Sequence, residues 1–132
     1  MIRGSCLCGG IRFEAADVPL IILCHCSKCR KVSGVASNAE FMAATGDLEW
    51  LSGEDQIRRY QMPDGWGTAF CSTCGSPLPK LHPSGGAYWV PAGLVEEPSG
   101  LEVTGHIFVD SKAPWDEIAG SAPRFSAGLS DG

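Results

Sequence analysis

The chain has 132 residues, enough for one domain, and 44% of them are hydrophobic, so it can bury a core and is not expected to be disordered. Acidic residues outnumber basic ones by 15 to 10, and the formal net charge of -5 argues against general binding to the phosphate backbone of nucleic acids. Seven cysteines, an odd number, exclude a fully paired set of disulfides within one chain.

The chain shows no sign of membrane insertion or secretion. Its longest purely aliphatic run is Leu20 to Leu23, far short of the roughly 20 residues that a membrane-spanning helix needs. The first residues, Met1 to Cys6, lack the apolar stretch of a secretory signal. We therefore expect a cytoplasmic protein whose thiols stay reduced. In that setting, clustered cysteines are more often metal ligands or catalytic groups than disulfides.

Short apolar stretches separated by glycine and proline turns predict mostly β structure. Ile11, Phe13 and Ala15 alternate with polar residues, which indicates a half-buried strand. The other predicted strands, in chain order, are residues 19–24, 40–44, 48–51, 57–61, 68–71, 87–90 and 101–109. Helical turns are expected only at residues 27–33 and 115–119. This pattern favours an all-β sandwich or an open barrel, followed from Gly120 onward by a loosely held tail.

Four of the cysteines form two matching pairs. Cys6 and Cys8 have the spacing C-x-C, and Cys71 and Cys74 have the spacing C-x-x-C. A glycine follows the second cysteine of each pair, and glycine permits the sharp turn that a loop around a metal needs. Zinc takes four tetrahedral ligands, so the two pairs together predict one four-thiolate site that contributes to folding. The alternative is that the pairs act as redox dithiols.

The other three cysteines are Cys24, Cys26 and Cys29, in the pattern C-x-C-x-x-C. Catalytic zinc sites combine three protein ligands with an open fourth position, and a substrate sulfur suits that position. Two alternatives stay open: a second structural site completed by a distant ligand, or a metal-free and reactive group of thiols. His25 alternates away from the flanking cysteines on an extended strand, which indicates a supporting or surface position rather than a ligand.

Basic residues are concentrated beside the third of these cysteines. Lys28, Arg30 and Lys31 are three of only ten in the chain, and such cations stabilise thiolates and attract anions. A solvated loop is the alternative interpretation. Arg58 belongs to a second basic pair and is a further candidate for an anion-binding rim. His106, Asp110 and Glu40 are candidate acid–base groups, but no spacing argument selects one of them.

These residues resemble the glutathione-dependent formaldehyde-activating enzyme family, which includes the centromere protein V group. The resemblance uses all seven cysteines and runs from about Arg3 to Ile118. The matching stretches are residues 4–11 (GSCLCGGI), 24–30 (CHCSKCR), 70–78 (FCSTCGSPL) and 106–115 (HIFVDSKAPW).

The resemblance implies a mainly β fold, the β-tent zinc fold, with small antiparallel sheets around a structural zinc. Together with the small, polar residues after Gly120, it predicts a domain over residues 1–119 and a flexible C-terminal tail over residues 120–132. It also implies two zinc ions per chain, the second not necessarily present in every molecule. The implied ligands are Cys6, Cys8, Cys71 and Cys74 for the structural zinc, and Cys24, Cys26 and Cys29 for the catalytic zinc.

The activity that the resemblance implies is that of a zinc-dependent carbon–sulfur lyase. Its substrate would be a small thiol adduct of the S-hydroxymethylglutathione type, made from glutathione and formaldehyde. Glutathione carries carboxylates, which Lys28, Arg30, Lys31 or Arg58 could attract. Two alternatives of other classes remain: a non-catalytic zinc module that binds a protein partner, and a redox-sensing thiol and zinc switch. Nucleic acid and membrane partners are not expected.

Overall fold

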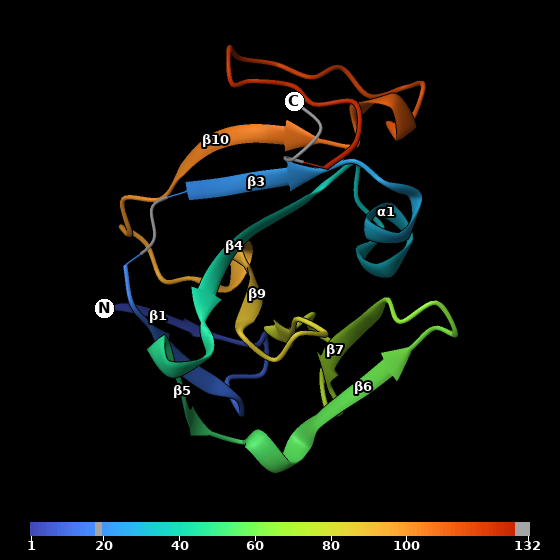
Figure 1. Ribbon diagram of the computed structural model, residues 1–132. Coiled ribbons are helices and arrows are strands. Elements are labelled where there is room, and N and C mark those ends of the chain that lie inside the picture. Colours follow the sequence, from blue (N-terminus) through green and yellow to red (C-terminus); the bar gives the residue numbers. More distant parts are fainter. Residues whose placement is uncertain (18–19, 129–132) are drawn as a thin grey trace. The chain divides into compact units, whose positions relative to one another are not determined.

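The protein is described by a computed structural model that places residues 1–17 and 20–128 (Figure 1). The chain divides into two compact units. The first unit comprises Met1–Pro19 and Phe41–Gly100, and the second comprises Leu20–Glu40 and Leu101–Gly132. The prediction of a mainly β chain with small sheets is confirmed.

The first unit contains an antiparallel sheet in the order β1-β2-β5, formed by β1 (Ile2–Ser5), β2 (Arg12–Ala15) and β5 (Leu48–Ser52). Phe13 is fully buried and packs edge-on against Trp50, with ring centroids 6.0 Å apart. Gly4 lies against the same ring, because a Cβ atom there would come within 2.7 Å of Phe13 Cε1. β1 is not among the strands predicted from the sequence, since a strand with glycine at a buried position lacks the usual alternation of apolar side chains.

Two antiparallel pairs complete the first unit. They are β6 (Ile57–Gln61) with β7 (Gly67–Cys71), and β8 (Lys80–Leu81) with β9 (Ala87–Pro91). Figure 1 shows β6 and β7 running side by side. One core cluster of this unit combines aliphatic residues with two cysteines: Cys6, Ile11, Ile57, Ala69, Cys71 and Leu78. The core and the predicted four-cysteine site therefore share residues.

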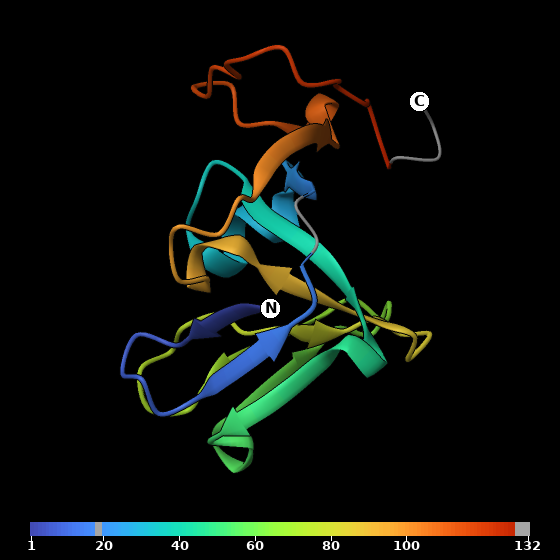
Figure 2. The same ribbon diagram turned by 90° about the vertical axis from the view of Figure 1, so that its left-hand side faces the viewer.

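The second unit is built on β3 (Leu20–Cys24), β10 (Glu102–Ile107) and the only α-helix of the described residues, α1 (Ser27–Ser33). β10 lies parallel to β3, which departs from the expected purely antiparallel sheets (Figure 1). Figure 2 shows β10, in orange, from the side. A parallel pair needs a long connection, and the chain between these strands provides one. The first residues of β4 (Asn38–Ala44) pair with β3 in this unit, and its later residues belong to the first unit.

Most predicted elements are found within a residue or two of their expected bounds. The predicted helical turn at residues 27–33 is α1, whereas the one at 115–119 is wrong. In its place the Asp116 N–H donates to the Ala113 carbonyl at 3.0 Å, which closes a turn with Pro114 at its second position. Short 3₁₀ helices, which the sequence did not reveal, occupy Thr45–Asp47, Glu54–Gln56, Ala92–Leu94 and Val109–Ser111.

The predicted tail begins at Gly120, and part of it is attached to the second unit. The His106 N–H donates to the Pro123 carbonyl and the Phe125 N–H donates to the His106 carbonyl, each at 2.9 Å. The Phe108 N–H donates in turn to the Ala127 carbonyl at 2.8 Å. Residues 129–132, and the residues 18–19 before β3, lie outside the described part of the chain. The domain boundary at residue 119 stays a prediction.

Among residues 1–17 and 20–128, no helix combines the length and the apolar character that a membrane span requires.

Replacing Phe13 by alanine should destabilise the first unit strongly. The ring is fully buried, so its removal should lower the free energy of unfolding by about 3–5 kcal/mol. Leu51 of β5 is 47% exposed, and Leu51→Ala should cost well under about 1 kcal/mol. Chemical denaturation of both variants measures the difference. Equal effects would contradict the placement of Phe13 in the core.

Candidate metal centres

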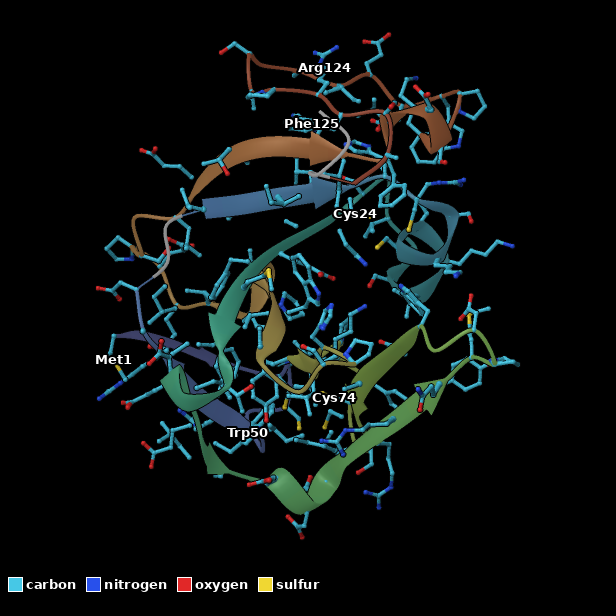
Figure 3. All side chains as sticks on the ribbon, viewed as in Figure 1. Met1, Cys24, Trp50, Cys74, Arg124 and Phe125 are labelled. Atoms are coloured by element: carbon cyan, nitrogen blue, oxygen red, sulfur yellow. The ribbon has the colours of Figure 1, made fainter. Side chains whose placement is uncertain are left out.

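Four cysteines of the first unit form one cluster, which we call the four-thiol cluster: Cys6, Cys8, Cys71 and Cys74. Their sulfur atoms all lie within 4.8 Å of one another, and Figure 3 shows the sulfurs gathered around Cys74. Tetrahedral zinc with bonds of about 2.3 Å requires sulfur atoms about 3.8 Å apart. The observed separations of 3.5 Å from Cys6 to Cys8 and 3.9 Å from Cys8 to Cys71 fit that requirement.

Both cysteine pairs form the tight loops that the glycines predicted. Gly9 and Gly75, which follow Cys8 and Cys74, share a left-handed φ of 77°. Backbone N–H groups point at the sulfurs: Ile11 N lies 3.4 Å from Cys6 Sγ, and Thr73 N lies 3.4 Å from Cys71 Sγ. N–H groups directed at sulfur stabilise thiolates, so the loops are prepared for negatively charged ligands.

The protonation of this cluster is uneven. A hydrogen bond from the Ser76 hydroxyl lowers the pKa of Cys74 to about 5. The backbone N–H of Gly10 lowers the pKa of Cys8, but the neighbouring thiols outweigh it and raise that pKa to about 11. One thiolate thus makes the next harder to form, and a cation is what allows all four sulfurs to be deprotonated.

The remaining cysteines form the three-thiol cluster in the second unit: Cys24, Cys26 and Cys29. Cys24, labelled in Figure 3, ends β3. Cys26 is the N-cap residue of α1, and Cys29 lies in that helix. The Cys29 N–H lies 3.4 Å from Cys26 Sγ, so the helix start itself brings these two sulfurs together. Among the described residues, the group includes no fourth histidine, cysteine or carboxylate.

Cys26 is the thiolate of this cluster. Hydrogen bonds from Cys24 and then Cys29 lower the pKa of Cys26 to about 2, and the bond with Cys26 raises the pKa of Cys24 to about 11. The same contacts, first with Cys24 and then with Cys26, raise the pKa of Cys29 above its ordinary value. Cys26 is also the one sulfur residue of the cluster that is not fully buried. The accessible side of the cluster is therefore its negatively charged side.

His25 is not part of the cluster, as its alternation predicted, but it is buried rather than on the surface, with only 2% of it exposed. Its Nε2 lies 3.1 Å from Nδ1 of His106, and its Nδ1 lies 3.5 Å from Oδ2 of Asp116. Burial lowers the pKa of both histidines, although the charge of Asp116 opposes this at His25. Both rings are therefore neutral at pH 7.

Asp116 is not among the acid–base candidates predicted from the sequence, which are His106, Asp110 and Glu40. Asp110 is exposed, in the 3₁₀ helix that follows β10. The proline at position 114 is the signal in the sequence that could have indicated a turn between Asp110 and Asp116. Glu40, the third acid–base candidate, lies on β4 opposite Ile22.

The predicted basic residues fall into both units. Lys28, Arg30 and Lys31 lie on α1, where Lys31 is exposed and Arg30 Nη2 donates to the Ser111 carbonyl at 3.4 Å. Arg58 lies on β6 in the first unit, where its guanidinium donates to the carbonyls of Asp55 and Ile57. A shared anion-binding rim of these residues stays a prediction.

Comparison with known proteins agrees with these features. A model of the family described as glutathione-dependent formaldehyde-activating enzyme matches residues 1–111, which include all seven cysteines. A Halomonas elongata protein, provisionally named as such an enzyme, is 29% identical over 133 aligned positions, covering 89% of this chain and 81% of the relative.

A crystal structure of a Rhodobacter sphaeroides protein has a similar fold, with a TM-score of 0.61 and 24% identity, covering 92% of this chain and 98% of that one. The family match covers most of the chain and both cysteine clusters. The chain therefore belongs to the family of glutathione-dependent formaldehyde-activating enzymes.

Proposed function

We propose that the chain is a zinc-dependent carbon–sulfur lyase that acts on a small thiol adduct of the S-hydroxymethylglutathione type. The observation that carries this proposal is the three-thiol cluster, in which three sulfurs converge and the described residues supply no fourth ligand. Structural zinc sites have four protein ligands, whereas catalytic sites have three and leave one position for substrate or water. The family to which the chain belongs supports glutathione and formaldehyde as the substrate class.

The two clusters would then have different roles. Cys6, Cys8, Cys71 and Cys74 would hold a structural zinc, and Cys24, Cys26 and Cys29 would hold a catalytic one. Zinc bound by three thiolates would supply Lewis acidity and favour the thiolate form of a sulfur ligand at neutral pH. The proposal also places the chain in the reducing cytoplasm, which suits seven free thiols.

The chain's own residues would bind and orient the substrate. Cys24 and Cys29 are buried, so an incoming thiol can approach the cluster only at the partly exposed Cys26. The cations Lys28, Arg30 and Lys31 follow along α1 and would attract the carboxylates of glutathione. In the cleavage direction the hydroxyl group of the adduct loses a proton, the carbon–oxygen double bond of formaldehyde forms, and the carbon–sulfur bond breaks to release the thiolate.

Metal analysis of two serine variants tests the division between the clusters. The unaltered protein should bind two zinc ions per chain, one for each cluster. Cys26→Ser should retain one zinc and the fold but lose lyase activity, because only the three-thiol cluster is disrupted. Cys71→Ser should lose the other zinc and unfold the first unit, because Cys71 is also 1% exposed in the core.

Elemental analysis gives the zinc content, circular dichroism follows the fold, and a formaldehyde-release assay follows activity. A single zinc ion in the unaltered protein, or full activity in Cys26→Ser, would contradict a catalytic zinc at the three-thiol cluster.

Reversing one charge on α1 tests the attraction of an anionic thiol. Lys31 is exposed, so Lys31→Glu should leave the fold intact and raise KM for the glutathione adduct by roughly threefold to tenfold, with little change in kcat. Added salt should reduce the difference, because it screens exposed charges.

Arg59→Glu is the matched control. Arg59 is an exposed residue of β6, so this variant changes the net charge equally but in the first unit. Its KM should equal that of the unaltered protein. The same increase in both variants would mean that net charge, rather than the residues of α1, controls substrate attraction.

A further inference from the structure

A chain of three polar side chains, two of them buried, lies within the second unit. His25 Nδ1 is 3.5 Å from Asp116 Oδ2, and His25 Nε2 is 3.1 Å from His106 Nδ1. His25 is 2% exposed, His106 is 4% exposed, and the side chain of Asp116 is 16% exposed. We call these three residues the histidine relay. None of them belongs to either cysteine cluster.

The proton positions in the relay follow from the pairing of its atoms. Only one proton fits between His25 Nε2 and His106 Nδ1, so one of these nitrogens donates and the other accepts. His25 Nδ1 is buried and has no hydrogen-bond partner among the described residues, which leaves the Asp116 carboxylate as the acceptor closest to it. With a proton on His25 Nδ1, facing the Asp116 carboxylate at 3.5 Å, His25 Nε2 would accept a hydrogen bond from His106 Nδ1. In this arrangement each ring has one tautomer and one orientation.

Such a network is a costly way to fill space. Removing polar groups from water is unfavourable unless their partners replace the lost hydrogen bonds, whereas a pair of apolar side chains could fill the same volume without that cost. What two hydrogen-bonded rings add is a defined geometry, because a directional bond fixes both position and orientation.

The geometry that the relay defines includes the cysteines on either side of His25. The His25 N–H donates to the Ile107 carbonyl at 3.0 Å, and Ile107 is the residue paired with Cys24 on the neighbouring strand. On an extended chain the ring of His25 points to the opposite face from Cys24 and Cys26. Holding the ring on one face therefore holds the two sulfurs on the other.

Further contacts keep Asp116 in place. The Lys112 ammonium donates to the Asp116 carbonyl at 3.0 Å and also contacts the Ala113 carbonyl. The turn from Ala113 to Asp116 thereby brings the carboxylate to the relay from a part of the chain far from Cys24 in sequence.

We infer that Asp116, His25 and His106 are positioning residues that hold Cys24 and Cys26 in the arrangement that receives the metal ion. This inference rests on the metal site of the proposed function and assigns to it a supporting network. Removing a polar group that orients a metal ligand without binding the metal itself typically lowers metal affinity by roughly 10-fold to 100-fold. The four-thiol cluster belongs to the other unit and includes none of the relay residues, so it serves as an internal reference.

The test compares Asp116→Ala with Glu117→Ala in the full chain loaded with zinc. Competition with a coloured zinc chelator gives the affinity of each site separately. Asp116→Ala should weaken the three-thiol site by about tenfold or more and leave the four-thiol site unchanged. Glu117 is exposed and adjacent, and Glu117→Ala should change neither affinity. Asp116→Asn, which keeps an acceptor oxygen at the same place, should restore most of the lost affinity.

A second readout does not depend on the metal affinity. The ring ¹⁵N signals of His25 should show one tautomer, protonated at Nδ1, in the unaltered protein and a mixture of tautomers in Asp116→Ala. His106→Asn keeps an N–H donor near His25 and should retain affinity, whereas His106→Leu should lose it. If His106 only stabilised the fold, the two variants would not differ in metal affinity according to whether the new side chain can donate a hydrogen bond.

Unchanged affinity of the three-thiol site in Asp116→Ala would overturn the inference, as would an equal loss at both sites. The outcome for the proposed function is separate. If the protein releases no formaldehyde from any thiol adduct but Asp116→Ala selectively weakens the three-thiol site, the lyase proposal fails and the positioning role stands. A chain that binds no metal at the three-thiol cluster would overturn both.

Discussion

Four thiolates cannot lie within a few ångströms of one another unless a cation offsets their repulsion. In the first unit this constraint coincides with the hydrophobic core, because Cys6 and Cys71 are buried among Ile11, Ile57 and Leu78. Sheets of two or three strands bury little apolar area by themselves. A metal ion at the four-thiol cluster would join the end of β1 to the end of β7, between sulfurs 63 residues apart in sequence. Closing so long a loop restricts the unfolded chain strongly, which is how such a site contributes to folding.

The three-thiol cluster is under a different constraint. Its sulfurs come from one short segment, the end of β3 and the first turn of α1, so a metal there closes no long loop and contributes little to folding. A site that does not maintain the fold can exchange a ligand without unfolding the protein. Such a site needs its sulfurs held in fixed positions. Here the end of β3, the N-cap of α1 and the buried His25, which are adjacent in the chain, hold them.

Local features of the molecule could be predicted from the sequence. The cysteine loops depend on spacing and on the glycines after Cys8 and Cys74, and both glycines have the expected backbone conformation. Most strands followed from short apolar stretches between glycine and proline turns, and β2 followed from the alternation of buried and polar residues. Strand β1 did not, because one of its two buried positions is Gly4, which faces the Phe13 ring, and Ile2 is its only apolar side chain. The approach of Asp116 to His25 also could not be predicted, because it depends on the parallel pairing of β10 with β3 and on a turn beyond it.

Helix α1 arranges charge along its length. Cys26, the thiolate of the cluster, caps its start, where the positive end of the helix dipole favours a negative charge. Arg30 and Lys31 lie in its last turn, where cations are favoured by the negative end. The helix would stabilise this distribution without any substrate, so the cations have a structural reason to be there. Under the proposed function the same distribution matches the substrate: a thiol that places its sulfur at the start of the helix extends its carboxylates toward the cations at the end.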